Sequence, residues 1–266
     1  MDIEGKYTKL KEIIGGLPKA LVAFSGGMDS TLLLKISVDL LGKKNVIAVT
    51  GKAPIIADET LKSARETAGL IGAEHLVVDT SVLTIEDFRK NPTERCYHCK
   101  RNLLEILFRV ADGKRIPYVL EGTNFDDLRD DRPGMRAVGE TGALSPLLQS
   151  KMTKADIRSL SGKLSLPTFN QLPDSCLATR VPYGTRIDEE LLKRIELAEE
   201  LIRGIGIAGV RVRCHGRIAR IEVPEPEFPK ILSEKQKVVE GLKRYGFLYI
   251  AIDLEGYKMG SMNETD

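Results

Sequence analysis

Hydrophobic and polar residues in the first half of the chain follow two spacings in turn, one typical of strands and one typical of helices. Short apolar runs that predict buried strands lie at residues 19–25, 45–50, 74–80 and 117–124. Stretches with a helical period lie between them, at residues 30–41, 58–72 and 96–111. Asp58 is a candidate N-cap for the second of these helices. Strands separated by helices form right-handed βαβ units, so we expect an α/β fold with a parallel sheet.

Three unusual loops follow the predicted strands, at residues 25–30, 51–57 and 122–136. Ligands of parallel sheets bind at the carboxyl ends of the strands. We therefore expect the functional site to be built from these loops.

The pattern changes after about residue 165, where a long connector with three prolines begins (residues 166–187). Beyond it the sequence predicts a helix at 188–206, a hairpin at 209–223 around Gly216, a helical region at 226–244 and a strand at 247–254. This order favours a second, smaller α+β domain with an antiparallel sheet. We place the first domain at residues 1–165 and assign the connector and the small domain to residues 166–266.

The segment SGGMDS lies between the first predicted strand and the first predicted helix. Gly26 and Gly27 let the backbone turn tightly, so that several N–H groups point at one anion in front of the helix. Ser25 and Ser30 add hydroxyl donors, and Asp29 is suited to bind Mg²⁺ or to cap the helix. The segment has neither the Gly-Lys-Ser/Thr of a Walker loop nor the third glycine of a dinucleotide fingerprint. An ordinary capped turn is the alternative, but the flanking strand and helix favour a phosphate site.

SGGMDS is similar to the PP-loop of the ATP pyrophosphatases, whose pattern is Ser-Gly-Gly-x-Asp-Ser. The resemblance implies an adenine nucleotide alpha-hydrolase-like fold, in which the loop holds the pyrophosphate of ATP and the enzyme adenylates its substrate. EGTNFDD (residues 121–127) supports it, because a Gly-Thr-Asn segment follows the fourth strand of these enzymes and lies near the nucleotide. The implied ATP-binding residues are Ser25, Gly26, Gly27, Asp29, Ser30, Gly122, Thr123 and Asn124.

Composition limits which enzyme this is. The chain has 266 residues, and its 40 basic and 38 acidic side chains leave a net charge of +2, which argues against binding to duplex nucleic acid. Its start, MDIEGKYTKL, has no signal-peptide pattern, and no apolar run is long enough to cross a membrane, so we expect a cytoplasmic protein. An amide ligase that hydrolyses glutamine would need a further domain, and a tRNA thiolase usually has a basic face. These two enzymes are the alternatives.

Five longer segments resemble the LarE family, in order and over roughly residues 15–225: NPTERCYHCK, EGTNFDDLRDDRPGMRA, SPLLQSKMTKADIR, PDSCLATRVPYGTRI and VRVRCHGRIARIEV. LarE proteins are ATP-dependent sulfur insertases that build the nickel-pincer nucleotide. The resemblance implies that ATP adenylates a carboxylate of pyridinium-3,5-biscarboxylic acid mononucleotide and that pyrophosphate is released. A sulfur nucleophile then displaces AMP and leaves a thiocarboxylate.

Cys176 is the first candidate for that sulfur chemistry. It lies in the proline-containing connector near Arg180, whose positive charge is expected to lower the pKa of the thiol. A thiolate is a suitable nucleophile for an acyl-adenylate. The alternative is an inert core cysteine. In some LarE members the cysteine at this position gives up its own sulfur and becomes dehydroalanine, which implies catalytic roles for Cys176 and Arg180.

Cys96 and Cys99 suggest a second source of sulfur. A Cys-x-x-Cys pair places two thiolates on one metal, and Cys176 would add a third. Three cysteines can hold a [4Fe–4S] cluster with one iron that has no protein ligand. The resemblance to three-cysteine LarE members implies that this iron carries the transferred sulfide, which requires the three cysteines to converge beside the nucleotide. A reduced thiol pair and an incidental zinc site are the alternatives, as is Cys176 acting alone as sacrificial donor.

The first strand of the predicted hairpin has two different faces. Val212 and Cys214 share one face and Arg211 and Arg213 the other, so we expect Cys214 in the core. The two arginines form either a solvated face or a clamp for the phosphate of the substrate. The matching family arginines imply the clamp.

Two acidic residues, Glu200 and Glu222, match family residues associated with a metal site, although the register between Glu199 and Glu200 stays open. We expect a small mononucleotide as partner, no duplex nucleic acid, no membrane, and a homo-oligomer. A nucleotide-binding sensor without turnover is the alternative outside the enzymes.

Overall fold

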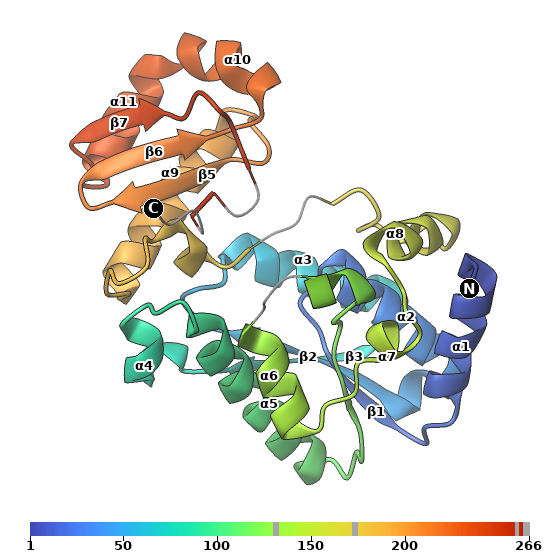
Figure 1. Ribbon diagram of the computed structural model, residues 1–266. Helices are drawn as coiled ribbons and strands as arrows, with labels where there is room; N and C mark the ends of the chain where they lie inside the picture. Colours follow the sequence, from blue (N-terminus) through green and yellow to red (C-terminus); the bar gives the residue numbers. More distant parts are fainter. Residues whose placement is uncertain (130–132, 172–174, 259–260, 263–266) are drawn as a thin grey trace. The chain divides into compact units, whose positions relative to one another are not determined.

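The computed structural model describes residues 1–129, 133–171, 175–258 and 261–262 (Figure 1). The chain divides into two compact units. Unit 1 comprises Met1–Phe88 and Thr93–Asp174, and unit 2 comprises Arg89–Pro92 and Ser175–Asp266. The short segment 89–92 is held within unit 2 by two backbone hydrogen bonds: Gly184 N donates to Asn91 O (2.9 Å) and Ile187 N donates to Arg89 O (2.8 Å).

Unit 1 is built on a four-stranded sheet in which every pair is parallel and the order is β3-β2-β1-β4. The strands are β1 (Ala20–Ala23), β2 (Val46–Lys52), β3 (Glu74–Asp79) and β4 (Val119–Leu120). The predicted parallel α/β fold is therefore confirmed. β4 has only two residues, and a parallel bridge from Leu120 to Leu144 extends its edge.

Helices of unit 1 include the three that the sequence predicts, α2 (Met28–Leu41), α3 (Asp58–Ile71) and α5 (Arg95–Gly113). Five more were not predicted: α1 (Ile3–Gly15), α4 (Glu86–Arg89), α6 (Pro133–Thr141), α7 (Pro146–Gln149) and α8 (Lys154–Lys163). Short 3-10 turns lie at Lys43–Asn45, Val82–Thr84 and Phe125–Arg129. The prediction of Asp58 as a cap was wrong: Ala57 is the N-cap of α3, and Asp58 lies in the first turn, where a negative charge favours the helix dipole.

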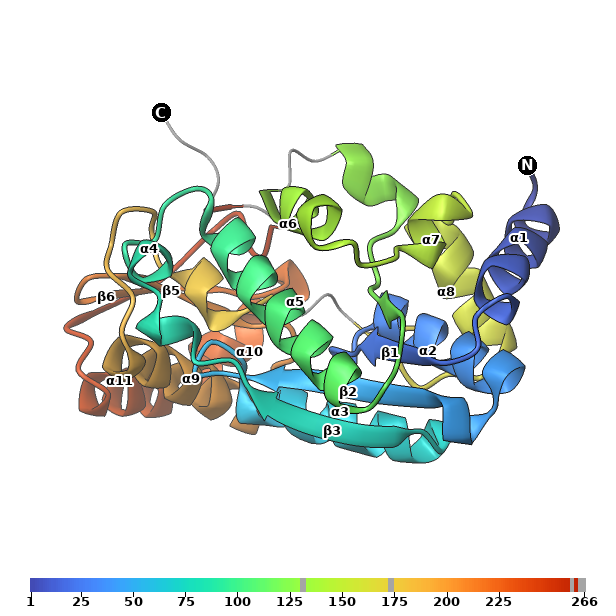
Figure 2. The same ribbon diagram turned by 90° about the horizontal axis from the view of Figure 1, so that it is seen from below.

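The two faces of this sheet are covered by different helices (Figures 1 and 2). Leu21, Ile47 and Val49 pack on one face against Leu104 and Leu107 of α5. Side chains of the opposite face pack against α1, α2, α3 and α8. Successive strand residues thus serve opposite layers, as the period of two requires. α6 packs beside α5.

Unit 2 contains a three-stranded sheet in the order β5-β6-β7. Its elements are the 3-10 turn η4 (Leu177–Arg180), α9 (Glu189–Gly204), β5 (Arg211–His215), β6 (Ile218–Glu222), the 3-10 turn η5 (Glu225–Glu227), α10 (Phe228–Ser233), α11 (Lys235–Arg244) and β7 (Tyr249–Ile252). The hairpin β5–β6 is antiparallel, but β7 runs parallel to β6. The prediction of an antiparallel sheet was therefore wrong for the third strand, because α10 and α11 return the chain as a crossover.

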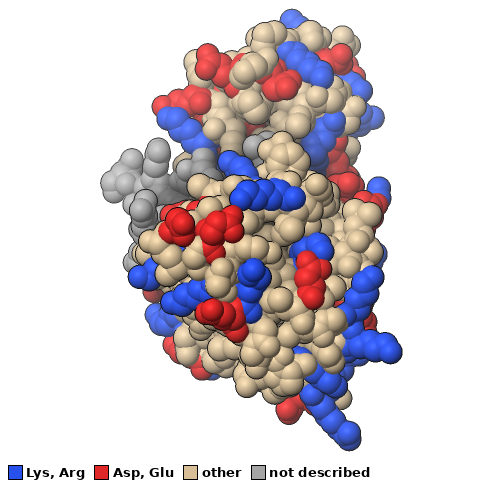
Figure 3. All heavy atoms as spheres, turned by 90° about the vertical axis from the view of Figure 1, so that its right-hand side faces the viewer, with Lys and Arg blue, Asp and Glu red and all other residues tan. Residues whose placement is uncertain are grey.

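Charged side chains of both signs are interspersed on the molecular face drawn in Figure 3. Among the helices of the described residues, none combines the length and the apolar composition that a membrane span requires.

Candidate functional site

The glycine-rich loop begins where β1 ends and leads directly into α2. Gly26 has a φ of +77°, and a Cβ at this position would lie 2.9 Å from the Cα of Ala64. Only glycine fits here without strain. The N-cap of α2 is Gly27, which has no side chain to cap the helix. The amides of the first turn therefore face the mouth of the loop, and with the helix dipole they favour an anion.

Two serine hydroxyls close the loop. Ser25 Oγ and Ser30 Oγ lie 3.0 Å apart, and Ser25 N donates to Ser30 Oγ (3.3 Å). Ser30 Oγ also donates to the carbonyl of Gly27 (3.1 Å). Asp29 is half-buried in the first turn of α2. The loop thus has a fixed shape before any ligand binds.

The segment after β4 lies against this loop. A Cβ at Gly122 would lie 3.4 Å from Ser30 N and 3.5 Å from Asp29 Cβ. Asn124 is fully buried, and its Oδ1 accepts from the amides of Asp126 (3.0 Å) and Asp127. The structure therefore brings together the PP-loop and the predicted Gly-Thr-Asn segment, and it gives Asn124 the role of holding the following turn.

Glu121 is a site residue that the sequence analysis missed. It is 1% exposed, and its Oε2 accepts from Lys100 Nζ (2.8 Å) and Thr123 Oγ1 (2.8 Å). Its Oε1 accepts from Thr123 N (3.1 Å) and from the Ser145 hydroxyl. Burial alone would raise the pKa of Glu121, but the Lys100 ammonium and the hydrogen bonds from Lys100, Ser145 and Thr123 outweigh burial and lower it. An acidic residue directly after a buried strand was the available signal.

Cys96 and Cys99 lie near the start of α5, one turn apart, so they share one side of the helix. Cys96 is exposed and Cys99 half-buried. Tyr97 between them ties α5 to α6, because its hydroxyl donates to Glu140 (2.7 Å) and its ring lies under the Arg136 guanidinium at 3.9 Å. This contact fixes the end of α5 that carries the two thiols.

Cys176 belongs to unit 2 and is the N-cap residue of η4. The guanidinium of Arg180 organises this segment: its Nη1 donates to the carbonyls of Ser175 (2.6 Å) and Cys176 (3.0 Å). Its Nε donates to Glu199 Oε1 (2.8 Å). Arg180 thus sets the backbone that carries Cys176. Its predicted action on the thiol stays a prediction.

Arg211 and Arg213 are both buried, which excludes the solvated face as their explanation. Arg213 donates to Glu222 Oε2 through Nε (2.9 Å) and Nη2 (2.6 Å), and to the carbonyl of Thr179 (3.1 Å). Arg211 donates to the carbonyl of Val210 (2.8 Å). β5 is therefore covered on both faces, and its polar face holds paired charges.

The acidic residues of unit 2 do not form the expected metal pair. Glu199 is the buried one, and it accepts from Val212 N (3.0 Å), whereas Glu200 is exposed. Burial would raise the pKa of Glu199, but Arg180 and the other donors outweigh burial and lower it. Glu222 accepts from two arginines and from the Ser261 hydroxyl (2.7 Å). Within the described part of either unit, no group of three or more His, Cys, Asp or Glu residues is arranged to hold a metal ion.

Cys214 lies in the core, as the strand period predicts, and is 1% exposed. Burial raises the pKa of its thiol, against a smaller opposite effect of Arg194, whose Nη2 lies 3.3 Å from Sγ. This thiol is therefore the least suited of the four to act as a nucleophile.

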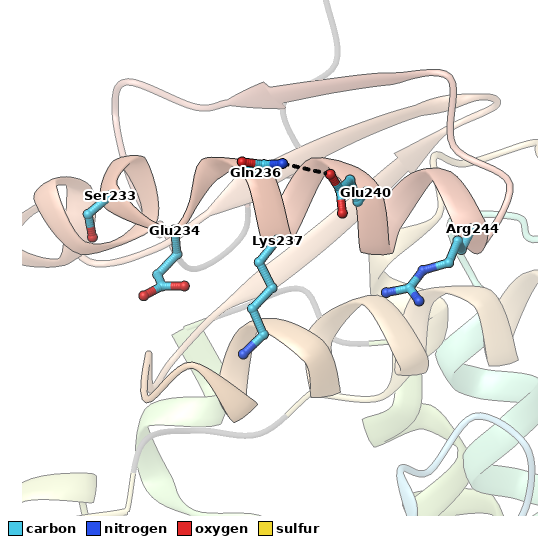
Figure 4. A pocket seen from close by; sticks show the side chains of 6 residues that line it. All are labelled: Ser233, Glu234, Gln236, Lys237, Glu240 and Arg244. Atoms are coloured by element: carbon cyan, nitrogen blue, oxygen red, sulfur yellow. Dashed lines mark hydrogen bonds between the residues drawn. The ribbon is translucent and has the colours of Figure 1, made fainter.

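A surface pocket on α10 and α11 contains none of the predicted site residues (Figure 4). Charged and polar side chains line it: Ser233, Glu234, Gln236, Lys237, Glu240 and Arg244. Gln236 is turned away toward Glu240, to which it donates a hydrogen bond of 3.0 Å. We assign this pocket no chemistry.

Comparison with known proteins gives three informative relatives, although no family model matches the chain. An uncharacterised protein of Synechocystis sp. is 38% identical over 99% of this chain and 98% of its own length. The pyridinium-3,5-bisthiocarboxylic acid mononucleotide synthase of Lactiplantibacillus plantarum is 34% identical over 98% of this chain and 94% of its own length. A shorter match, 24% identical over 61% of this chain, is to a glutamine-hydrolysing GMP synthase of Thermoplasma volcanium.

Proposed function

Because the chain belongs to the LarE family of the PP-loop ATP pyrophosphatases, we propose that it is an ATP-dependent sulfurtransferase. Its acceptor is pyridinium-3,5-biscarboxylic acid mononucleotide, one carboxylate of which becomes a thiocarboxylate. The similarity to the Lactiplantibacillus plantarum synthase over nearly the whole chain is the observation that carries this proposal.

Adenylation is the first step. The amides of residues 26–30 and the N-terminus of α2 bind the phosphates of ATP, for which the positive φ of Gly26 and the uncapped helix start are the support. A half-buried aspartate beside a phosphate site suits Mg²⁺, so we assign the ion to Asp29. The acceptor carboxylate attacks the α-phosphorus, the bond to the bridging oxygen breaks, and pyrophosphate leaves with that electron pair.

Sulfur transfer is the second step. A sulfur nucleophile attacks the acyl carbon of the adenylate, and AMP leaves with the C–O bonding electrons. We propose that Cys96, Cys99 and Cys176 bind a [4Fe–4S] cluster, which would supply the transferred sulfide. The donors fit such a group, because two thiols lie one helical turn apart at accessible positions and the third is half-buried in an irregular segment. The sacrificial use of Cys176 is the alternative within the same reaction.

Arg211 and Arg213 are the proposed contacts for the phosphate of the mononucleotide. Five buried or half-buried arginines of unit 2 form ion pairs or ring contacts around the polar face of β5, against three carboxylates: Arg180, Arg203, Arg211, Arg213 and Arg220, with Glu199, Glu222 and Asp253. The excess positive charge supports binding of an anion there. Glu200 and Glu222 are not proposed as metal ligands, because Glu222 is already paired with arginines.

The test is turnover by anaerobically purified protein supplied with ATP, Mg²⁺ and the mononucleotide. Pyrophosphate release together with a thiocarboxylate product supports the proposal. ATP binding without pyrophosphate release would support the sensor instead, and release only with a tRNA or an amine acceptor would identify another PP-loop enzyme. Iron and sulfide content, and the intact mass after reaction, separate the two sulfur sources. The predicted homo-oligomer stays a prediction.

A further inference from the structure

Glu121 joins four parts of unit 1 at the carboxyl end of the sheet. It follows the last residue of β4, binds Lys100 on α5, binds Thr123 of the next loop, and receives the hydroxyl of Ser145 before α7. The PP-loop is adjacent, because Gly122 packs against the first turn of α2. A single buried carboxylate therefore connects the cysteine-bearing helix to the nucleotide loop.

Lys100 is the more accessible partner in this arrangement. Its side chain is 29% exposed, whereas that of Glu121 is 1% exposed. An ammonium has three N–H donors, of which Glu121 takes one. The partial exposure of the side chain leaves the ammonium within reach of a ligand at this end of the sheet. Polyphosphate bound in front of α2 would meet this positive charge.

We infer that Glu121 is a positioning residue of the nucleotide site, and that it holds the Lys100 ammonium where the ammonium contacts the phosphates of bound ATP. The inference rests on the proposed function only in that ATP must bind at residues 25–30.

Two physical arguments favour this role over a purely structural one. A buried ion pair contributes little net stability compared with an apolar pair of the same volume, so stability alone does not explain it. In addition, a carboxylate beside a phosphate site repels the ligand unless a cation lies between them. The observed pair provides that cation at a distance of 2.8 Å from the carboxylate. Thr123, one of the predicted nucleotide residues, is fixed by the same carboxylate.

The experiment compares E121Q, K100M and the double variant with wild type. Dissociation constants for Mg²⁺–ATP come from calorimetry, and the kcat and KM values come from pyrophosphate release. We expect each single variant to weaken ATP binding or lower kcat by about tenfold to a hundredfold, the cost of a misplaced charged contact. The KM for the mononucleotide should stay unchanged. The double variant should be no worse than K100M, because Glu121 acts through Lys100.

The matched control is K114M on the same helix, where Lys114 pairs with Glu74 at 2.9 Å on the surface. It should behave as wild type. If E121Q does not fold, K100M alters a partly exposed side chain and still tests the ammonium, and K100R should restore part of the affinity. Folded E121Q and K100M with ATP affinity and kcat within about twofold of wild type would overturn the inference, as would additive losses. A wild type that binds ATP but releases no pyrophosphate would overturn the proposed function alone, because the ratio of ATP affinities would still report on Glu121.

Discussion

Arg180 Nε lies 2.8 Å from Glu199 Oε1, and both side chains are 1% exposed. The same guanidinium holds the carbonyl of Cys176 at 3.0 Å. The position of a proposed sulfur residue is therefore set by a buried ion pair between the connector and α9.

Removing one partner of this pair should destabilise the protein strongly. In R180A the Glu199 carboxylate keeps its burial but loses its main counter-charge, so we expect a loss of about 3–5 kcal/mol in the free energy of unfolding. Urea denaturation measures the change. As a control, K258M removes an exposed pair with Glu255 and should have little effect. A stable R180A protein would show that water or another residue takes over the role of Arg180.

Acid should reveal the same pair. The pKa of Glu199 is lowered in the folded protein, so its contribution to stability is fully present above the ordinary glutamate range of about 4.3 and is lost as the pH falls through the folded value. We expect unfolding free energy to fall with acidification more steeply in wild type than in E199Q. Equal slopes for the two proteins, measured by urea denaturation at several acidic pH values, would contradict the assignment.

Asp29→Ala should slow pyrophosphate release by about a hundredfold, the usual effect of losing one electrostatic contact in a transition state. The residue lies in the first turn of α2 beside the proposed phosphate site. D39N, on the same helix and exposed, is the control. Unchanged adenylation in D29A would show that Mg²⁺ is held elsewhere.

Replacing Arg211 or Arg213 by glutamine should raise the KM for the mononucleotide more than the KM for ATP. Loss of one charge-assisted contact costs about 1.5–3 kcal/mol, which corresponds to roughly ten- to a hundredfold. Steady-state kinetics with a phosphate-free analogue provides the control, since that analogue should be insensitive to either change. An equal loss with the analogue would remove the phosphate from the explanation, and would point instead to disruption of the pairs with Glu222.

Single Cys→Ala changes at positions 96, 99 and 176 should each abolish cluster assembly and repeated thiolation but leave pyrophosphate release nearly intact. Cys214→Ala should affect neither activity, since this thiol is buried in the core and has a raised pKa. Iron analysis and multiple-turnover assays provide the measurement. The sacrificial mechanism predicts a different result: C96A and C99A stay active, and Cys176 loses the mass of H₂S after one turnover.

Local pattern predicted the parallel sheet because the strands are apolar on both faces and the loops follow them at fixed places. It also placed Cys214 correctly from the strand period. It failed for β7, whose direction depends on the path of α10 and α11 and not on its own residues. Glu121 was missed for a related reason: its partners Lys100 and Ser145 are distant in sequence, and only the fold brings them together.

The assignment of residues 89–92 to unit 2 has a consequence for synthesis of the chain. The polypeptide enters unit 2 at Arg89, returns to unit 1 at Thr93, and leaves again at Ser175, so it crosses three times. Asn91 and Arg89 emerge from the ribosome long before Gly184 and Ile187, the residues that donate to their carbonyls. A nascent chain that ends before the connector therefore lacks those two hydrogen bonds, directly upstream of Cys96. Completion of this region awaits the second half of the protein.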